Sequence, residues 1–365
     1  MVAIHELPKW PDFRWDSSIL VGSLGGVARK QGHLQGRLES LGFRLRDEAV
    51  VQTLTQDVVK SSEIEGDILD RSQVRSSIAR RLGLETAASA QVDRHIEGVV
   101  QMMLDATQRF AQPLSVERLI GWHAALFPSG RSGLRRIITG RFRDDSEGPM
   151  QVVSGEFGRE RVHFEAPPAS RLSAEVDDFV QWFESGKASS IVGAAVAHLW
   201  FVTLHPFDDG NGRIARAIAD MALARSEGSA QRFYSMSAQI RQARDAYYDI
   251  LERTQHGDLD ITEWLLWFIE TLSRAIDGAD AELAAILRKA RFWEKDALVG
   301  INERQRRILN AVLDGTIESL TSSKYAKVAK CSQDTAARDI NDLMSRGVLT
   351  KGQHGGRSTS YELVV

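Results

Sequence analysis

The segment from His205 to Arg216 gathers an imidazole, two carboxylates, two glycines and two arginines in the order His-Pro-Phe-Asp-Asp-Gly-Asn-Gly-Arg-Ile-Ala-Arg. Gly210 and Gly212 let the backbone fold tightly, so consecutive N–H groups can converge on one anion, and a following helix adds the partial positive charge of its N-terminus. Arg213 and Arg216 fall on nearly the same helical face and are suited to bind further phosphates. The segment predicts a phosphate-binding loop.

Two more side chains of this loop are suited to chemistry on a bound phosphate. His205, with an ordinary pKa of about 6.5, is mostly neutral at cytosolic pH and can take a proton from an attacking hydroxyl. Asp209 can bind Mg²⁺ (or Mn²⁺), because Mg²⁺ prefers one or two carboxylates together with phosphate oxygens. A helix N-terminus with a capping asparagine and surface arginines is the alternative for any one residue alone. It is disfavoured for all of them together.

The elements around the loop are expected to be helices. Apolar residues recur at helical spacing in several segments, at 47–81, 92–107, 116–127 and 172–183. Gly66 is expected to divide the first segment into two helices, and Ser115 is placed to cap the third. The apolar stretch 191–204 predicts a buried helix that leads into His205, and helices continue to about residue 290. Only 150–164, with two β-type runs around a polar segment, predicts a β-hairpin.

Both ends of the chain predict smaller units. The first 50 residues, with Pro8 and Pro11 before a glycine-containing stretch, predict a small cap. From about residue 302, three helical segments and a glycine-rich pair of short strands predict a winged helix-turn-helix.

These residues support a family resemblance. HPFDDGNGRIAR matches HPFxDGNGRxxR, the signature of the Fic-domain family, and the chain resembles the subgroup that has an N-terminal inhibitory helix and a C-terminal winged helix. The resemblance implies an all-α core with a β-hairpin flap, arranged as a helical cap at 1–110, a Fic domain at 111–290 and a winged helix-turn-helix at 300–365. It implies transfer of AMP from ATP to a Ser, Thr or Tyr hydroxyl of a protein, with the chain itself as one candidate target.

The resemblance also implies roles for single residues. His205 becomes the general base, Asp209 the Mg²⁺ ligand and Arg216 the contact to the γ-phosphate. The remaining expected ATP-binding residues are Phe207, Asp208, Gly210, Asn211, Gly212, Arg213, Tyr247 and Tyr248. Burial in the core is the alternative for the two tyrosines, which the family places near the adenosine.

A second motif implies inhibition in cis. Ser61-Ser-Glu-Ile-Glu65-Gly66 matches (S/T)xxxE(G/N), the family's inhibitory helix, expected at about 57–66. A pair between Glu65 and Arg216 would keep that arginine from the γ-phosphate, so ATP would bind in an unproductive pose. Glu65 could instead orient a water for removal of AMP, and the sequence does not distinguish these roles. A helix end with a solvated glutamate is the structural alternative.

The predicted hairpin corresponds to the family's flap, which pairs with an extended stretch of the target. Val162, His163 and Phe164 are the expected target-binding residues. A purely structural hairpin with an exposed His163 is the alternative.

Composition limits the other function classes. The 46 Lys and Arg nearly balance the 49 Asp and Glu, so overall charge does not indicate nucleic acid. From 303 to 365, ten basic against seven acidic residues give a net charge of +3, and the expected recognition helix carries Asp334, Asp339 and Asp342. A regulator that binds DNA through the winged helix is therefore an alternative, but not the favoured one.

Location and assembly follow from the same reading. The single cysteine, Cys331, the lack of a secretion signal and apolar stretches too short to cross a bilayer predict a cytoplasmic protein without membrane contact. A homodimer is expected from the resemblance alone.

Overall fold

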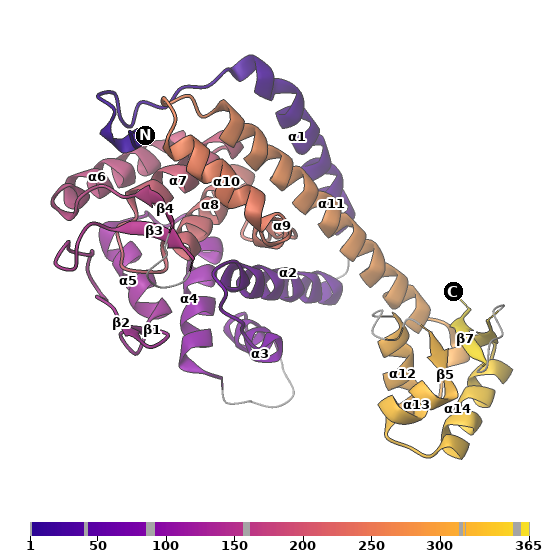
Figure 1. The fold of residues 1–365 in the computed structure, drawn as a ribbon. Helices are drawn as coiled ribbons and strands as arrows, with labels where there is room; N and C mark the ends of the chain where they lie inside the picture. Colours follow the sequence, from indigo (N-terminus) through magenta and orange to yellow (C-terminus); the bar gives the residue numbers. More distant parts are fainter. Residues whose placement is uncertain are drawn as a thin grey trace. The chain divides into compact units, whose positions relative to one another are not determined.

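The computed structural model describes residues 2–39, 43–84, 92–155, 161–313, 317, 319–352 and 359–364. The chain forms two compact units, Met1–Asp280 and Ala281–Val365 (Figure 1). Helices dominate both units and the strands form only small antiparallel sheets, which confirms the predicted all-α class. Within the described ranges, no helix combines the length and the apolar character that a membrane span would need.

The helices of the first unit follow one another with few strands between them. They are α1 (Ser17–Glu39), α2 (Phe43–Ile64), α3 (Arg71–Arg81), α4 (Arg94–Gln108), α5 (Val116–Leu126), α6 (Ala169–Trp182), α7 (Ile191–Leu204), α8 (Asn211–Glu227), α9 (Met236–Gln242), α10 (Arg244–Gln255) and α11 (Thr262–Trp293), which continues into the second unit. Short turns at Ile4–Glu6 (3₁₀) and Phe183–Lys187 (π) complete the unit. The predicted break at Gly66 lies between α2 and α3, and the Ser115 hydroxyl caps α5 by accepting from the N–H of Arg118.

Two helices form the centre of this unit. Every residue of α7 from Gly193 to Leu204 is buried, and α8 is buried from Arg213 to Ala224. A helix that is apolar on all sides can be accommodated only inside a shell of other elements. That shell includes α2, α4 and α5 against α8, and α6 against α7. The turn between α7 and α8, which holds the predicted phosphate loop, is thus supported on both sides by core helices.

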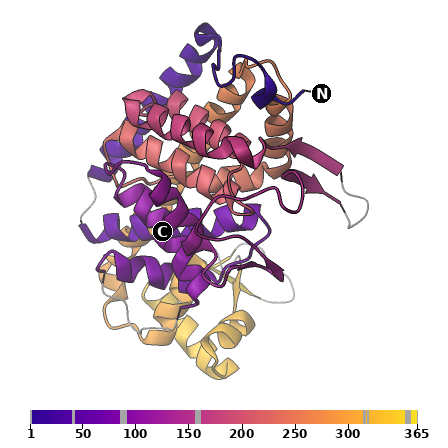
Figure 2. The same cartoon turned by 90° about the vertical axis from the view of Figure 1, so that its left-hand side faces the viewer.

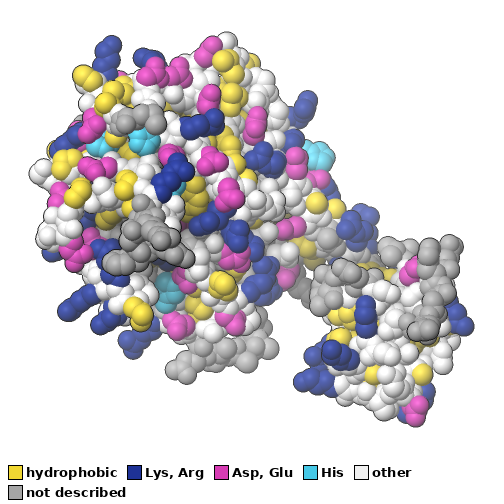
Figure 3. Space-filling view, viewed as in Figure 1, with side chains coloured by type: hydrophobic (Ala, Val, Ile, Leu, Met, Phe, Trp, Pro, Cys, Tyr) yellow, Lys and Arg dark blue, Asp and Glu magenta, His cyan; other side chains and the backbone are white. Residues whose placement is uncertain are grey.

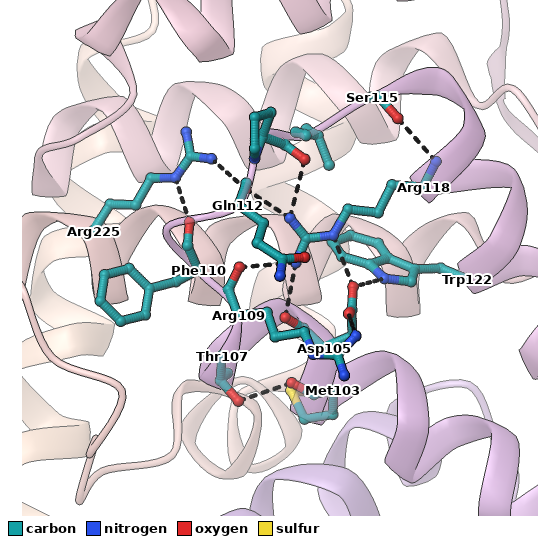
Figure 4. A network of polar contacts seen from close by, with 12 residues as sticks. Met103, Asp105, Thr107, Arg109, Phe110, Gln112, Ser115, Arg118, Trp122 and Arg225 are labelled. Carbon is teal, nitrogen blue, oxygen red and sulfur yellow. Dashed lines mark hydrogen bonds and ion pairs between the residues drawn. The ribbon is translucent and has the colours of Figure 1, made fainter.

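A polar network fastens α4 to α5 near their ends (Figure 4). The Arg118 guanidinium donates to the Asp105 carboxylate at 2.7 Å and to the carbonyl oxygens of Asp105 and Gln112, each at 2.8 Å. The Trp122 indole donates to the same carboxylate at 2.8 Å. Arg225, near the end of α8, donates to the carbonyl of Phe110 at 2.8 Å. These bonds fix the angle between α4, α5 and α8 by satisfying backbone groups at helix ends.

Two hairpins connect α5 to α6. The predicted hairpin consists of β3 (Gln151–Ser154) and β4 (Arg161–Glu165), which are antiparallel and extend away from the helices in Figure 2. Its connecting residues 156–160 lie outside the described part of the chain. A smaller hairpin, β1 (Arg131–Ser132) and β2 (Arg135–Arg136), was not expected from the sequence.

The second unit contains α12 (Glu303–Leu313), α13 (Ser322–Ala329) and α14 (Gln333–Ser345), after a 3₁₀ turn at Asp296–Leu298. Its three-stranded sheet has the order β5-β7-β6, from β5 (Leu320–Thr321), β6 (Leu349–Lys351) and β7 (Ser360–Leu363). The three helices and the last two strands were predicted, whereas β5 was not. The glycine-rich residues 353–358 lie outside the described ranges, and the winged-helix interpretation stays a prediction.

Candidate active site

His205 lies directly after α7, in the left-handed conformation at φ 48° and ψ 55°. Its Nδ1 lies 3.1 Å from the carbonyl oxygen of Val202, so Nδ1 carries the proton and donates, and Nε2 keeps a free lone pair. The ring is half-buried, and this loss of water lowers the pKa of His205 below its usual value. A neutral imidazole with an available Nε2 has the form that a general base requires.

Arg143 holds the backbone around His205 in place. Its buried guanidinium donates to the carbonyl oxygens of His205 at 2.8 Å and Pro167 at 2.5 Å, and it pairs with Asp145 at 3.0 Å. Its own N–H donates to the Pro206 carbonyl at 3.0 Å. The sequence analysis did not identify Arg143, and nothing in the local pattern distinguishes it from the exposed arginines beside it.

The side chains at the start of the loop hold its shape. The Asn211 amide donates to the carbonyl of Phe207 at 2.7 Å, and its oxygen accepts from the N–H of Phe207 at 3.0 Å. The Phe207 ring is fully buried and stacks on His123 with centroids 4.2 Å apart. Asp208 accepts from the backbone N–H of Ile138 at 2.8 Å. The side chains of Phe207 and Asn211 therefore hold the shape of the loop, and their nucleotide contacts stay a prediction.

The anion-binding part of the loop begins at Gly210. Its φ of 81° would strain any other residue, and a Cβ there would lie 2.9 Å from the Phe127 ring. Gly210 is the N-cap residue of α8, and the first N–H groups of a helix have no acceptor within it. The N-terminus of a buried helix thus faces the loop, as predicted.

Both predicted arginines are buried beneath the loop. Arg213 lies over the Phe127 ring, 5.0 Å from its centroid, and Arg216 donates to the Ser61 hydroxyl at 2.9 Å and the Ser61 carbonyl at 2.8 Å. Each keeps one buried nitrogen without a hydrogen-bond partner among the described residues, Nε of Arg213 and Nη1 of Arg216. Buried donors of this kind are costly unless a ligand satisfies them.

Glu65, at the end of α2, reaches this arginine cluster. Its Oε1 lies 2.9 Å from Nη2 of Arg216, and its Oε2 accepts from the Tyr248 hydroxyl at 3.2 Å. A Cβ at position 212 would lie 2.3 Å from the same Oε1, so the close approach depends on Gly212. The predicted pair between Glu65 and Arg216 is present in the structure, and Ser61 contributes to it as the motif suggested.

Asp67, two residues after Glu65, contacts the other arginine. Its carboxylate lies 3.5 Å from Nη1 of Arg213 and 2.7 Å from Nε2 of His95. The hydrogen bond to His95 lowers the pKa of Asp67, and the same bond raises the pKa of His95. The segment around Gly66 thus sets one carboxylate against each arginine of the loop, although the sequence analysis predicted only the first.

Asp209 points toward the β1–β2 hairpin, where its Oδ2 accepts from the Ser132 hydroxyl. Its Oδ1 accepts from the N–H of Gly210 at 2.5 Å. No group of three or more metal-binding side chains occurs among the residues that the structure describes. A lone, partly exposed carboxylate beside an anion-binding loop suits Mg²⁺, which takes one or two carboxylates and completes its shell with phosphate oxygens and water.

A cleft of about 600 Å³ joins these groups. Its walls include Glu65, His205, Asp209, Gly210, Tyr247 and Tyr248. Tyr247 is buried and its hydroxyl lies 2.8 Å from Nε2 of His198, so the alternative of a core aromatic holds for most of that ring. Burial and the Glu65 carboxylate raise the pKa of Tyr248 to about 12, so its hydroxyl is protonated and can donate.

The flap lies at the edge of the cleft, and its three predicted residues differ in their surroundings. Val162 is exposed and free to contact another chain. The His163 ring is bonded on both sides, to Glu252 of α10 at 2.6 Å and to the Ser154 hydroxyl at 2.5 Å. Phe164 is buried against Ala3 and Ala166 and anchors the hairpin. His163 and Phe164 also line the cleft, and contact of the three residues with a target stays a prediction.

Comparison with known proteins agrees with this geometry. Residues 113–223 match the family model described as Fic/DOC family, and residues 4–84 match a domain of unknown function, DUF4172. The protein adenylyltransferase Fic of Aedes aegypti is 28% identical over 210 residues, which are 56% of this chain and 38% of that protein. The chain therefore matches well under half the length of this curated relative.

Two solved structures share the fold. A Fic family protein from Desulfovibrio desulfuricans has a TM-score of 0.53 and 22% identity, covering 94% of this chain and 96% of that chain. A Fic domain containing signaling protein from Bacteroides thetaiotaomicron has a TM-score of 0.52 and 18% identity, covering 73% of this chain and 97% of that chain. The helical core around α7 and α8 therefore has the fold of these Fic structures. Residues 113–223 of the chain form a domain of the Fic/DOC family.

Proposed function

We propose that the protein transfers AMP from ATP to a Ser, Thr or Tyr hydroxyl of a protein, and that Glu65 inhibits this transfer in cis. The observation that carries the proposal is the shared cleft. Its walls include His205, the first residues of α8, and Glu65, which pairs with the buried Arg216 behind it. Curated relatives named protein adenylyltransferase Fic support the same reaction.

In this mechanism the protein mainly orients and neutralises charge. A target hydroxyl placed at Nε2 of His205 gives up its proton as its oxygen bonds to the α-phosphorus, and the bond to the departing pyrophosphate breaks. In the proposed reaction, the amides at the start of α8 and the unpartnered nitrogens of Arg213 and Arg216 would bind phosphate oxygens. Asp209 would hold Mg²⁺, which supplies positive charge to the phosphates when bound.

Inhibition follows from competition for Arg216. Glu65 binds Nη2 while Ser61 holds Nε, so the guanidinium is directed toward α2. A γ-phosphate entering the same space would meet the Glu65 carboxylate as a like charge. ATP would then bind with its α-phosphorus out of line with His205, and a misplacement of about 1 Å can cost about a hundredfold in rate.

The test is incorporation of label from ATP radioactive at the α-phosphate, in the presence of Mg²⁺. Glu65→Gly should label itself or proteins of a cell lysate at least about a hundredfold faster than wild type, in line with the value of a transition-state charge contact. Glu65→Gly with His205→Ala should be silent while still binding ATP. Label that enters from the γ-phosphate, and never from the α-phosphate, would refute AMP transfer.

Glu63→Gly is the matched control, because it removes a glutamate from the same helix end. Glu63 pairs with Lys60 at 2.7 Å and lies 3.6 Å from Arg241, with no contact to the arginines of the loop. It should label as slowly as wild type. Equal activation by Glu63→Gly would mean that loosening of α2, rather than the Arg216 pair, controls the rate.

Removal of AMP is a second candidate, supported by the position of the Glu65 carboxylate in the wall of the cleft. There it could orient a water toward the phosphorus of a modified side chain. Wild type and Glu65→Gly should be compared on a target that Glu65→Gly has labelled. Release of AMP by wild type alone would establish this second activity.

A further inference from the structure

The β1–β2 hairpin lies at the mouth of the cleft without having a role in the proposed chemistry. Ser132, next to its turn, donates to the Asp209 carboxylate, and Arg135 on the opposite strand lines the cleft. The register pairs Arg131 with Arg136 and Ser132 with Arg135, which leaves Gly133 and Leu134 as the tip. The hairpin is therefore fixed to the predicted metal ligand through Ser132, while the neighbouring Leu134 at the tip is exposed.

Its side chains are arginines that have few carboxylate partners. Arg135 pairs with the exposed Glu147 at 3.0 Å, whereas Arg131 and Arg136 have no ion pair with any residue that the structure describes. Between residues 131 and 148, five arginines against three carboxylates give a net charge of +2. Figure 3 shows several Lys or Arg side chains gathered at the lower left, where Figure 1 places β1 and β2.

The tip adds an apolar contact to this charge. Leu134 is 94% exposed, and it follows Gly133, whose positive φ of 55° makes the tight turn. A single exposed leucine needs no explanation on its own. Leu134, however, lies in the same hairpin as Arg131 and Arg136, which have no ion pair among the described residues, and at the mouth of a cleft. Arginines around an exposed apolar residue are typical of protein-binding surfaces.

A second cleft of about 470 Å³ runs from the hairpin along residues 144–151. It shares Arg135, Met150, Gln151 and Asp208 with the cleft that holds His205, so the two clefts adjoin. Of its three carboxylates, Asp144 is paired with Arg141 at 3.3 Å and Glu147 with Arg135 at 3.0 Å, and Asp208 accepts from the N–H of Ile138. A chain that places a hydroxyl near His205 can therefore continue past β3 toward the unpaired arginines.

We propose that the β1–β2 hairpin is a second contact for the protein target and binds an acidic segment that carries one apolar residue, next to the modified hydroxyl. Arg131 and Arg136 pair with the acidic side chains, and Leu134 contacts the apolar one. The inference rests on the proposed function, since it requires a protein target in the main cleft. It adds the chemical class of that target, which the flap alone does not specify.

Direct binding tests the surface separately from catalysis. The probe is a fluorescein-labelled peptide with one Thr, one Leu and otherwise Asp, Glu and Ser, compared with a counterpart that has Lys in place of Asp and Glu. Anisotropy with the Glu65→Gly protein should show binding of the acidic peptide only, and binding should weaken as salt rises. Equal affinity for both peptides, or no binding of the acidic one, would overturn the proposal.

Two sets of variants locate the contact. Arg131→Glu with Arg136→Glu should lower the affinity for the acidic peptide by about tenfold or more, because two surface ion pairs are lost and replaced by repulsion. Leu134→Ala should also lower the affinity for the acidic peptide by about tenfold, because one leucine contact that is buried on binding is lost. Arg29→Glu with Lys327→Glu, two exposed positions elsewhere, changes the net charge equally and should leave binding unaltered. Equal weakening by this control would attribute the effect to overall charge.

Two further measurements separate this contact from nucleic-acid binding and from the proposed AMP transfer. Duplex DNA that displaces the acidic peptide and binds more tightly would assign the arginines to nucleic acid and refute the target contact. AMP transfer to the Thr of the acidic peptide, measured by α-phosphate label, should fall with the two reversals while self-labelling persists. If the peptide binds as predicted but no substrate is ever labelled, the proposed function fails and the acidic-segment contact stands.

Discussion

His205 depends on contacts made by its neighbours more than on its own side chain. The left-handed backbone at the end of α7 turns the ring toward the cleft, and the Val202 carbonyl selects the tautomer with Nε2 free. A left-handed conformation is uncommon for a residue other than glycine and costs about 1 kcal/mol or more. Arg143 stabilises it by binding the His205 carbonyl.

The pKa of His205 predicts the pH dependence of the reaction. Burial lowers this pKa below its ordinary value of about 6.5, so the neutral form dominates at pH 7 and is lost only on acidification. The rate should therefore be flat near neutrality and fall with a midpoint below about pH 6.5. The initial rate of labelling should be measured across this range with Glu65→Gly, the variant in which transfer is expected to be fast. A midpoint above the ordinary value would contradict His205 as the base.

Asp67 allows a second prediction at this scale. Its carboxylate lies near Arg213 and, with the pKa lowered by the bond from His95, it is ionised at neutral pH. Asp67→Asn should raise the affinity for MgATP by about threefold, since one negative charge leaves the phosphate site. Calorimetric titration measures this, with Asp177→Asn on the exposed face of α6 as the control. Unchanged affinity would show that Asp67 only supports α3 and α4.

At the scale of elements, the α7–α8 turn is held by a segment far away in the sequence. The Arg143 guanidinium contacts two backbone carbonyls and the Asp145 carboxylate at once. A lysine ammonium cannot reproduce these contacts together, because it lacks the several N–H donors of the planar guanidinium. Arg143→Lys should lower the free energy of unfolding by about 2–4 kcal/mol and reduce labelling in the Glu65→Gly background. Thermal unfolding and the labelling rate measure the two effects. Arg141→Lys, two residues away and exposed, should change neither.

Local signals allowed most helices to be predicted. The cap at Ser115, the break at Gly66 and the uninterrupted apolar stretch before His205 each act within one or two turns, so the sequence displays them directly. The pairing of Glu65 with Arg216 was accessible because two short motifs carry it. These are features that one stretch of chain defines alone.

Contacts between distant segments could not be predicted in this way. Arg143 and Ser132 look like ordinary surface residues in the sequence, yet one is buried under His205 and the other binds Asp209. The position of His95 against Asp67 depends on the packing of α3 against α4. No local periodicity encodes such distances, which follow from the tertiary fold.

The whole chain consists of two units with separate cores. In the second unit, Asp339 of α14 accepts from the Tyr325 hydroxyl at 2.9 Å and from Arg304 at 3.0 Å. The sequence suggested that this aspartate would face phosphates, but it is buried within the unit. The negative charge of Asp339 is therefore no argument against DNA binding. The charges of Asp334 and Asp342 still disfavour it.

This internal pair predicts how the units unfold. Asp339→Ala leaves the buried Tyr325 hydroxyl without its acceptor, at a cost of about 1–3 kcal/mol. Hydrogen exchange should accelerate across residues 303–352 and stay unchanged in α7 and α8. Faster exchange throughout the chain would show that the two units unfold as one.

The space that Gly212 leaves open has a consequence for how the proposed inhibition could be lost. Position 65 can exchange its glutamate and leave the phosphate loop intact, so a single substitution there would free the enzyme. Position 212 cannot gain a methyl group without displacing Glu65 and crowding Arg216, whose Nη1 would lie 3.2 Å from the new carbon. A genetic selection for uninhibited protein should therefore recover changes on the helix that carries Glu65. Substitutions at position 212 would also disturb the phosphate loop and should not be recovered.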